Sequence, residues 1–277
     1  MRDCPVAVFD SGIGGLTYLP SAMALLPDTR FVYVADHANF PYGATDPDLL
    51  RDRVADLVRR IIERESPCAV LVACNTASVV ALADLRSRFS IPFVGVVPAV
   101  KPAASLSRNR RIGVLATTRT VEERYLADLV AQFAGHCSVT TVAAGDLVTL
   151  VEDHLGEPPA DAAEAVLAPA VQRLRDAAVD TVVLGCTHFI YLLDELRERF
   201  GPSVEVVDSR EGVARRLAAV VASAAPPVPT AVETGRTGSG AAYGRGLKGH
   251  RFYTTAVGVA GLSRLAARFA LTDEGTL

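Results

Sequence analysis

Two stretches of the chain, Ala69-Val-Leu-Val-Ala-Cys74-Asn-Thr-Ala-Ser and Thr181-Val-Val-Leu-Gly-Cys186-Thr-His-Phe-Ile, repeat one pattern. Each begins with a run typical of a buried strand, reaches a cysteine and continues through polar residues into a predicted helix. Both predicted helices end on Leu-Arg-x-Arg-Phe, at residues 85–89 and 196–200. Upstream, Val6-Ala-Val-Phe-Asp10-Ser11 matches Ile112-Gly-Val-Leu-Ala116-Thr117. The repeat predicts two similar α/β halves that face each other across a pseudo-twofold axis.

Short β-branched runs alternate with helical stretches along the chain, which predicts an α/β protein with largely parallel sheets. Strands are predicted over residues 6–9, 31–35, 69–73, 93–97, 112–116, 138–142, 181–184 and 204–207. Helices are predicted over residues 47–65, 78–89, 121–133, 159–177, 192–200 and 210–223. Residues 226–229 and 235–249 are predicted loops, after which the chain returns through 250–255 to a last helix over 261–269.

The composition indicates a protein that handles small molecules. A length of 277 residues favours two domains, and half of the residues are hydrophobic. With 21% charged residues and a net charge of -3, no basic stripe suggests nucleic acid or a membrane surface. No signal-peptide core and no uninterrupted apolar run of membrane-spanning length is found, so we expect a cytoplasmic protein. Five cysteines do not suggest a disulfide framework, and Cys4, Cys68 and Cys137 are interpreted as structural.

Cofactor and metal chemistry are disfavoured by what the sequence lacks. The only lysines are Lys101 and Lys248, and neither lies in a convincing strand-end loop for a pyridoxal-phosphate Schiff base. His37, His136, His154 and His250 show no metal-ligand spacing. We therefore expect activity without a cofactor and without a metal.

Cys74 and Cys186 each stand at the carboxyl end of a predicted strand, just before a helix. Ligands of open α/β sheets bind beyond the carboxyl ends of the strands, so facing halves would bring both thiols to one cleft. Two opposed thiols suit inversion of a stereocentre, because one base removes a proton from one face and the other returns one. A thiol has a reference pKa near 8.5, and a helix N-terminus is expected to lower it. The competing interpretation, buried core cysteines, is the commoner one. It does not explain the polar residues that follow each thiol.

The polar residues beside the thiols suit a carboxylate ligand. Backbone N–H groups and hydroxyls at a helix start bind carboxylates well. Asp10-Ser11-Gly-Ile-Gly14-Gly15 is a further strand-to-helix turn, but it lacks the Gly-Lys-Ser/Thr of a phosphate-binding loop. Asp10 is a candidate to bind the substrate ammonium or to govern the protonation of a thiol, and helix capping is the alternative.

Several segments, in order over nearly the whole chain, resemble the signature segments of glutamate racemases, in the Asp/Glu racemase superfamily. They are Phe9-Asp-Ser-Gly-Ile-Gly-Gly-Leu-Thr17, Tyr33-Val-Ala-Asp36, Pro41-Tyr-Gly43, Ala73-Cys-Asn-Thr-Ala77, Gly95-Val-Val-Pro98, Leu115-Ala-Thr117 to Thr120, Leu184-Gly-Cys-Thr-His188 and Arg251-Phe-Tyr-Thr254. The resemblance implies two pseudo-symmetric α/β domains with the active site in the cleft between them. The first would comprise residues 1–98 with 209–277, and the second residues 99–208.

The resemblance also implies site residues. Cys74 and Cys186 would be the paired proton donors and acceptors, with Cys74 serving the D-enantiomer and Cys186 the L-enantiomer. Asp10 would assist Cys74, and His188 with Glu152 would assist Cys186. The implied substrate-binding residues are Asp10, Ser11, Pro41, Tyr42, Gly43, Asn75, Thr76, Thr117, Thr120, Thr187 and His188. The chain departs from the usual pattern at Phe189-Ile-Tyr191, where an aromatic residue, Pro and Leu are common, and at Thr254-Thr-Ala-Val-Gly258, which lacks the common Gly-Asp-Pro.

The function implied by this resemblance is cofactor-independent interconversion of L- and D-glutamate, supplying D-glutamate for peptidoglycan synthesis. Three alternatives stay open: a racemase of aspartate, a hydrolase or decarboxylase that uses one cysteine, and an amino-acid-binding protein without chemistry. The expected partner is the small-molecule substrate. The oligomeric state is open, with a homodimer as one candidate.

Overall fold

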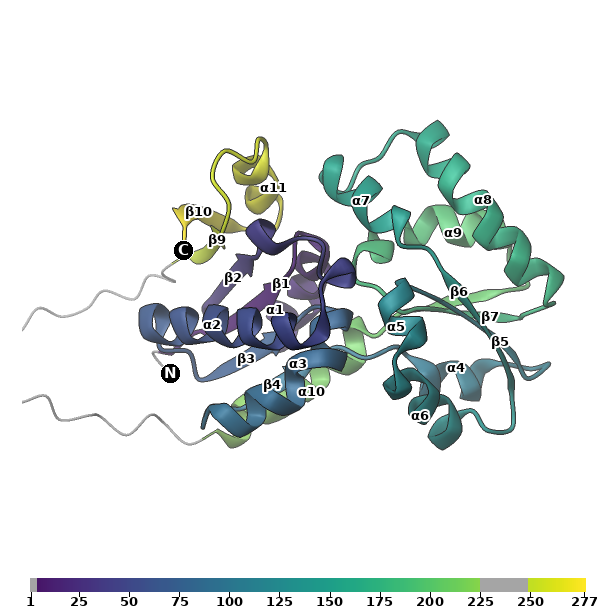
Figure 1. The fold of residues 1–277 in the computed structure, drawn as a ribbon, viewed down its shortest axis with the longest axis horizontal. Coiled ribbons are helices and arrows are strands. Elements are labelled where there is room, and N and C mark those ends of the chain that lie inside the picture. The colour runs from purple at the N-terminus through teal and green to yellow at the C-terminus, as the bar shows by residue number, and fades with distance from the viewer. Residues whose placement is uncertain (1–3, 225–248) are drawn as a thin grey trace, which may run out of the picture.

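The computed structural model describes residues 4–224 and 249–277. They form two α/β lobes side by side, each built on its own parallel sheet (Figure 1). The predicted fold class, two α/β domains with parallel sheets, is confirmed. In the described part of the chain, no helix is both long enough and apolar enough to cross a membrane.

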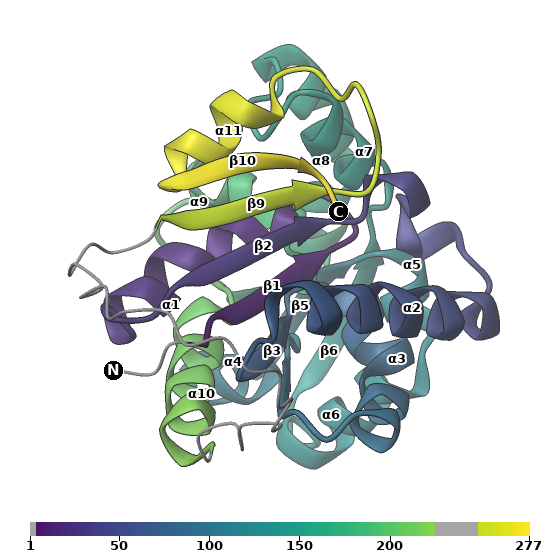
Figure 2. The ribbon, with the colours of Figure 1, turned by 90° about the vertical axis from the view of Figure 1, so that its left-hand side faces the viewer.

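The first lobe contains a six-stranded sheet in the order β10-β9-β2-β1-β3-β4, and every strand pair in it is parallel (Figure 2). The strands are β1 (Val6–Asp10), β2 (Phe31–Ala35), β3 (Ala69–Val72), β4 (Phe93–Gly95), β9 (His250–Thr254) and β10 (Leu271–Thr276). Alternate residues of β1 enter two different cores. Val6 and Val8 pack on the side of α1 (Leu19–Leu25) and α10 (Arg210–Ser223), and Ala7 and Phe9 on the side of α2 (Pro47–Glu65) and α3 (Asn75–Arg88).

The second lobe contains a four-stranded parallel sheet in the order β6-β5-β7-β8. Its strands are β5 (Arg111–Ala116), β6 (Ser138–Ala143), β7 (Thr181–Leu184) and β8 (Glu205–Val207). Its helices are α4 (Val100–Leu106), α5 (Thr118–Glu122), α6 (Arg124–Phe133), α7 (Asp146–Asp153), α8 (Ala160–Asp176) and α9 (Leu193–Phe200). The order 6-5-7-8 repeats the order 2-1-3-4 of the first sheet, so the predicted internal symmetry is present in the strand topology.

The chain crosses between the lobes more than once. After β8, helix α10 returns to pack against α1, and β9, α11 (Leu262–Arg268) and β10 then extend the first sheet beside β2. These crossings lie near the predicted domain boundaries at 98/99 and 208/209, which stay a prediction. Of the two predicted loops, residues 226–229 lie outside the described residues, and only Gly249 of the 235–249 segment is described.

Several elements differ from the prediction, and helices α1, α4 and α7 are additional to the predicted set. The helix expected over 121–133 is two helices, because Thr117 caps an earlier start by accepting a hydrogen bond from the Thr120 N–H and Glu123 then takes an extended backbone. The helix expected at Leu192 begins instead at Leu193, after a five-residue 3₁₀ helix, η4 (His188–Leu192). Strand β10 was not predicted, since most of its side chains are polar and largely exposed, and such an edge strand lacks an apolar pattern.

Candidate active site

A cavity of about 240 Å³ lies between the two lobes. Its walls come from segments that follow the carboxyl ends of β1, β2 and β3 in the first sheet and of β5, β6 and β7 in the second. The lining residues are Ser11, Pro41, Tyr42, Gly43, Ala44, Cys74, Asn75, Thr76, Thr117, Thr118, Gly145, Val148, Thr149, Cys186, Thr187 and His188. Three strand ends of each sheet therefore contribute to one small site, as expected for ligands of parallel sheets.

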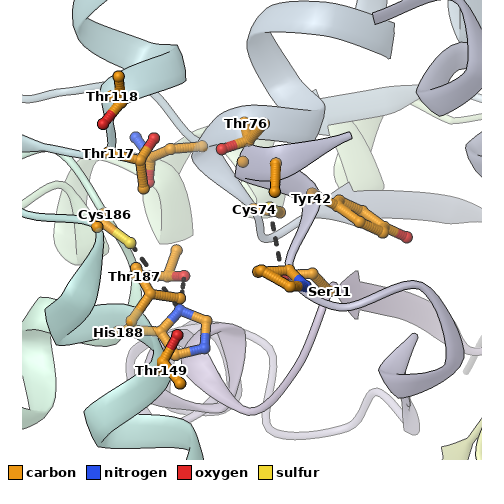
Figure 3. A pocket seen from close by; sticks show the side chains of 16 residues that line it. Ser11, Tyr42, Cys74, Thr76, Thr117, Thr118, Thr149, Cys186, Thr187 and His188 are labelled. Carbon is orange, nitrogen blue, oxygen red and sulfur yellow. Dashed lines mark hydrogen bonds between the residues drawn. The ribbon is translucent and has the colours of Figure 1, made fainter. Parts of the chain in front are cut away.

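Cys74 and Cys186 approach this cavity from opposite sides (Figure 3). Each residue is buried, with 6% of its surface exposed, and each belongs to a different lobe. Both thiols are free. A planar carbon held between them could lose a proton to one thiol and gain a proton from the other, on opposite faces.

Cys74 is the N-cap residue of α3, and its Sγ lies 4.0 Å from the Ser11 Oγ. Burial and the nearby Asp10 carboxylate raise the pKa of the Cys74 thiol well above its ordinary value, and these effects outweigh the hydrogen bond from the Ala77 N–H. The N–H at the start of α3 does lower this pKa as predicted, but burial and Asp10 outweigh it, so the net shift is upward rather than downward. A raised pKa favours the protonated form of the Cys74 thiol.

Cys186 lies beside a hydrogen-bonded pair of ionisable side chains. Its Sγ is 3.9 Å from Nδ1 of His188, and Nε2 of His188 is 2.7 Å from Oε2 of Glu152. Burial disfavours charge on His188, but Cys186 and Glu152 raise its pKa well above the ordinary value. Burial likewise opposes charge on Glu152, yet hydrogen bonds from His188 and His37 lower its pKa to about 2. A protonated His188 therefore places a positive charge next to the Cys186 sulfur.

The turn after β1 approaches the second lobe so closely that side chains cannot fit. A Cβ on Gly12 would lie 2.2 Å from Glu152 Oε2, and a Cβ on Gly14 would lie 2.4 Å from the Thr187 Oγ1 and 2.6 Å from the His188 Nδ1. The Ile13 N–H, in the same turn, donates to Glu152 at 3.1 Å. The glycines of this motif thus allow contact between the lobes rather than a phosphate cradle.

Asn75 carries a buried side-chain amide for which neither Oδ1 nor Nδ2 has a hydrogen-bond partner among the described residues. The residue is 3% exposed and lines the cavity. A buried amide without partners is costly, so this group indicates a polar ligand at the start of α3. The corresponding position in the second lobe, Thr187, is already engaged, because its hydroxyl donates to Asp10 at 3.1 Å.

Most of the site residues implied by the resemblance are brought together here. Those that line the cavity are Cys74, Cys186, Ser11, Pro41, Tyr42, Gly43, Asn75, Thr76, Thr117, Thr187 and His188. Three others do not line it. Asp10 is fully buried behind Ser11 and accepts from the N–H groups of Ser11 and Gly15, Glu152 lies behind His188, and Thr120 is a buried partner of the Thr117 hydroxyl.

Sequence reasoning missed several residues at the site. Thr118 lies beside the predicted Thr117, Gly145 immediately precedes α7, and Val148 and Thr149 lie on α7, the helix that carries Glu152. The i, i+3 spacing of Thr149 and Glu152 on one helix face was the available signal. His37 had been assigned no role, yet it contacts Glu152. No group of three or more side chains suited to a metal ion occurs within residues 4–224 and 249–277.

Comparison with known proteins identifies relatives along most of the chain. The family model described as Asp/Glu/Hydantoin racemase matches residues 19–217. A glutamate racemase of Sphingopyxis alaskensis is 46% identical over 220 residues, covering 78% of this chain and 81% of that protein. A glutamate racemase of Mesorhizobium japonicum is 42% identical over 238 residues, covering 85% and 89%.

Solved structures agree with these relatives. The crystal structure of Escherichia coli glutamate racemase in complex with L-glutamate and the activator UDP-MurNAc-Ala matches with a TM-score of 0.85 and 34% identity, covering 99% of this chain and 98% of that one. Glutamate racemase from Thermus thermophilus in complex with β-chloro-D-alanine matches with a TM-score of 0.68 and 30% identity, covering 99% and 96%.

Proposed function

Since the chain belongs to the Asp/Glu/Hydantoin racemase family, we propose that it is an isomerase that interconverts L- and D-glutamate and supplies D-glutamate for peptidoglycan synthesis. The observation that carries the proposal is the pair of buried thiols on opposite sides of one small cavity. Racemisation needs two acid/base groups on opposite faces of Cα, whereas a hydrolase or decarboxylase needs one cysteine.

In the direction from L to D, the thiolate of Cys186 takes the Cα proton of L-glutamate. The Cys74 thiol then gives its proton to the opposite face of the carbanion, which yields D-glutamate. At the end of the turnover Cys74 is the thiolate and Cys186 the thiol, so the enzyme is ready for the reverse direction. His188 supports the thiolate of Cys186, and Glu152 holds His188. Asp10 raises the pKa of the Cys74 thiol and so favours the protonated form that donates to the carbanion.

Substrate binding is assigned to the polar groups around the thiols. The unpartnered amide of Asn75 and the hydroxyls of Ser11, Thr76 and Thr187 would receive the carboxylate and ammonium groups. The N-terminus of α3 favours a negative charge close to Cys74. Donors on the α-carboxylate also stabilise the charge that develops when Cα loses its proton.

Circular dichroism with deuterium exchange tests this function. Purified protein in deuterium oxide should bring the signal of either glutamate enantiomer to zero, with one deuterium incorporated at Cα and no loss of total glutamate. Binding without exchange would indicate a binding protein, and loss of glutamate would indicate a hydrolase or decarboxylase. The same assay with L- and D-aspartate tests the alternative that aspartate is the substrate.

Cytoplasmic location is part of the proposal, since catalysis needs two free thiols and the cytosol keeps thiols reduced. A homodimer stays a prediction, which sedimentation of the purified protein with and without glutamate would test.

A further inference from the structure

We propose that His37 is a positioning residue for Cys186: it fixes the Glu152 carboxylate and, through Glu152, the orientation of His188. The inference deepens the proposed function and rests on it, since it concerns the proton transfer to Cys186. His37 lies in η2 (His37–Asn39), the short 3₁₀ turn after β2, and so belongs to the first lobe, whereas Glu152 and His188 belong to the second.

Glu152 is held at both of its oxygens. Nε2 of His37 lies 2.7 Å from Oε1. Nε2 of His188 lies 2.7 Å from Oε2, and the same oxygen accepts a hydrogen bond from the Ile13 N–H at 3.1 Å. The side chains of His37 and Glu152 are 7% and 8% exposed, so little water is available to replace either partner. A carboxylate with donors on both oxygens cannot rotate freely, and His188 is thereby held with Nδ1 toward Cys186.

Thr254 contacts the other ring nitrogen of His37, Nδ1. Its Oγ1 lies 2.9 Å from Nδ1 of His37 and accepts a hydrogen bond from the Ala256 N–H at 3.2 Å. The hydroxyl proton is thus free to point at Nδ1, and in that arrangement Nε2 carries the ring proton that faces Glu152.

A second threonine fixes the backbone around His37. The Thr255 hydroxyl donates to Asp36 at 2.6 Å and accepts from the Ala38 N–H at 3.0 Å. Thr254 and Thr255 belong to the segment in which this chain lacks the Gly-Asp-Pro common in glutamate racemases. This departure therefore supplies two hydroxyl groups. The Thr254 hydroxyl contacts His37 itself, and the Thr255 hydroxyl contacts the residues before and after it.

This support reaches only one of the two thiols. A chain of contacts runs from His37 through Glu152 and His188 to Cys186. Cys74 instead contacts Ser11, and its pKa is raised by the Asp10 carboxylate. Loss of the His37 donor should therefore slow proton abstraction by Cys186 and leave abstraction by Cys74 nearly unchanged. A general loss of folding or stability would instead affect both.

The test measures each thiol separately, with L- and D-glutamate carrying chlorine at Cβ. One thiolate removes the Cα proton, chloride leaves with the C–Cl bonding pair, and the resulting enamine hydrolyses to a keto acid and ammonium. His37→Leu should lower kcat for the L-compound about tenfold and that for the D-compound less than about twofold, consistent with a hydrogen bond to a charged group. His37→Gln places an amide donor near the position of Nε2 and should restore most of the L-rate.

Two further variants keep the test decisive. Thr254→Val removes the hydroxyl at Nδ1 with little change in shape and should give a smaller loss of the same L-selective kind. His250→Leu is the matched control: this histidine lies on β9, accepts from the Phe31 N–H at 3.0 Å, and should leave the ratio of L- to D-rates unchanged.

Equal losses for both enantiomers in His37→Leu, or no recovery in His37→Gln, would overturn the role of His37. If His37→Leu does not fold, an unchanged ratio in Thr254→Val overturns it instead. Failure of the proposed function is distinguishable, because the wild-type protein would then not racemise glutamate, or Cys186→Ser would keep its L-elimination.

Discussion

The surroundings of Cys74 and Cys186 differ far more than the strands that carry them. Both thiols follow the third strand of the shared topology, β3 and β7. Cys74 caps a 14-residue α-helix and lies near the Asp10 carboxylate, which with burial raises the pKa of the thiol. Cys186 precedes a 3₁₀ turn and faces a histidine whose pKa is raised by Glu152 and by Cys186 itself. Symmetry of the fold places the thiols on opposite sides of the cavity, whereas the charged groups beside them differ: a carboxylate, Asp10, near Cys74 and a histidine, His188, near Cys186.

Replacing either thiol should have the largest effect on racemisation. Cys74→Ser and Cys186→Ser should each lose racemisation by about 10²- to 10⁴-fold, because a hydroxyl is a far weaker acid than a thiol. With a leaving group at Cβ, Cys74→Ser should process only the L-compound and Cys186→Ser only the D-compound. The same preference in both variants, or near wild-type racemisation in either, would contradict two opposed bases. Cys68→Ser is the control and should change little beyond stability.

His188→Asn should separate the two sides by a smaller amount. We expect kcat to fall about 10- to 100-fold in the direction L to D and less in the reverse direction, since the variant removes the cation beside Cys186. The kcat/KM values must fall together, because the equilibrium constant between enantiomers is fixed. Equal changes of kcat in both directions at every pH would count against the assignment of His188 to Cys186.

Glu152→Gln should reduce the free energy of unfolding by an amount that depends on pH, because it removes the charge of Glu152 next to His188. The depressed pKa of Glu152, about 2, contributes stability that is present above the unfolded carboxyl pKa and is lost as pH falls toward 2. The raised pKa of His188 contributes stability that is present below about 6.5 and is lost as pH rises through the folded value.

The free energy of unfolding in urea should therefore differ between wild type and Glu152→Gln by about 2–3 kcal/mol between pH 5 and 6.5. The difference should shrink as pH falls from 5. The difference between wild type and Cys74→Ser should stay flat over this range, because the raised pKa of Cys74 lies far above it. A difference in free energy of unfolding between wild type and Glu152→Gln that does not change with pH would contradict a charged Glu152–His188 pair.

Asn75→Leu should weaken binding without weakening the fold. Its amide has no hydrogen-bond partner in residues 4–224 and 249–277, so we expect KM for glutamate to rise about tenfold while the urea midpoint does not fall. Thr187→Val is the counterpart in the second lobe. It loses the hydrogen bond to Asp10 and should cost about 1 kcal/mol of stability. A destabilised Asn75→Leu with unchanged KM would show that the amide has another role.

Removal of metal ions should have no effect on the rate of racemisation. Racemisation should survive dialysis against EDTA, and the protein should show no pyridoxal absorbance. Activity lost to EDTA and restored by a metal would contradict the interpretation of the histidine spacing.

Elements with strong local signals could be predicted from the sequence, and those defined by distant contacts could not. Helix α2 has the predicted bounds, because Asp46 caps it, Pro47 begins it and Ser66 ends it in a left-handed conformation. Strand β7 and helix α10 also have the predicted bounds. In contrast, the 3₁₀ start after Cys186 reflects the contact of this segment with the turn after β1, which local propensity does not encode.

The same distinction applies to the site. Cys74 and Cys186 were recognisable because each stands in a repeated motif with its polar neighbours. His37 stands in no spacing pattern, and its partner Glu152 is 115 residues away, so only the folded chain reveals the contact. The sign of the Cys74 pKa was missed for a related reason. Helix position is read from sequence, whereas burial and the position of Asp10 are properties of the assembled lobes.

The parallel pairing of β2 with β9 has a consequence for synthesis on the ribosome. The contact between Phe31 and His250 joins residues 219 apart, and the whole second sheet is translated between them. Domains generally fold as they emerge, so the second sheet can form while the first still lacks two of its six strands. Until β9 arrives, the edge of β2 is unpaired and His37 lacks Thr254. The nascent enzyme therefore contains both thiols well before it can complete the surroundings of one of them.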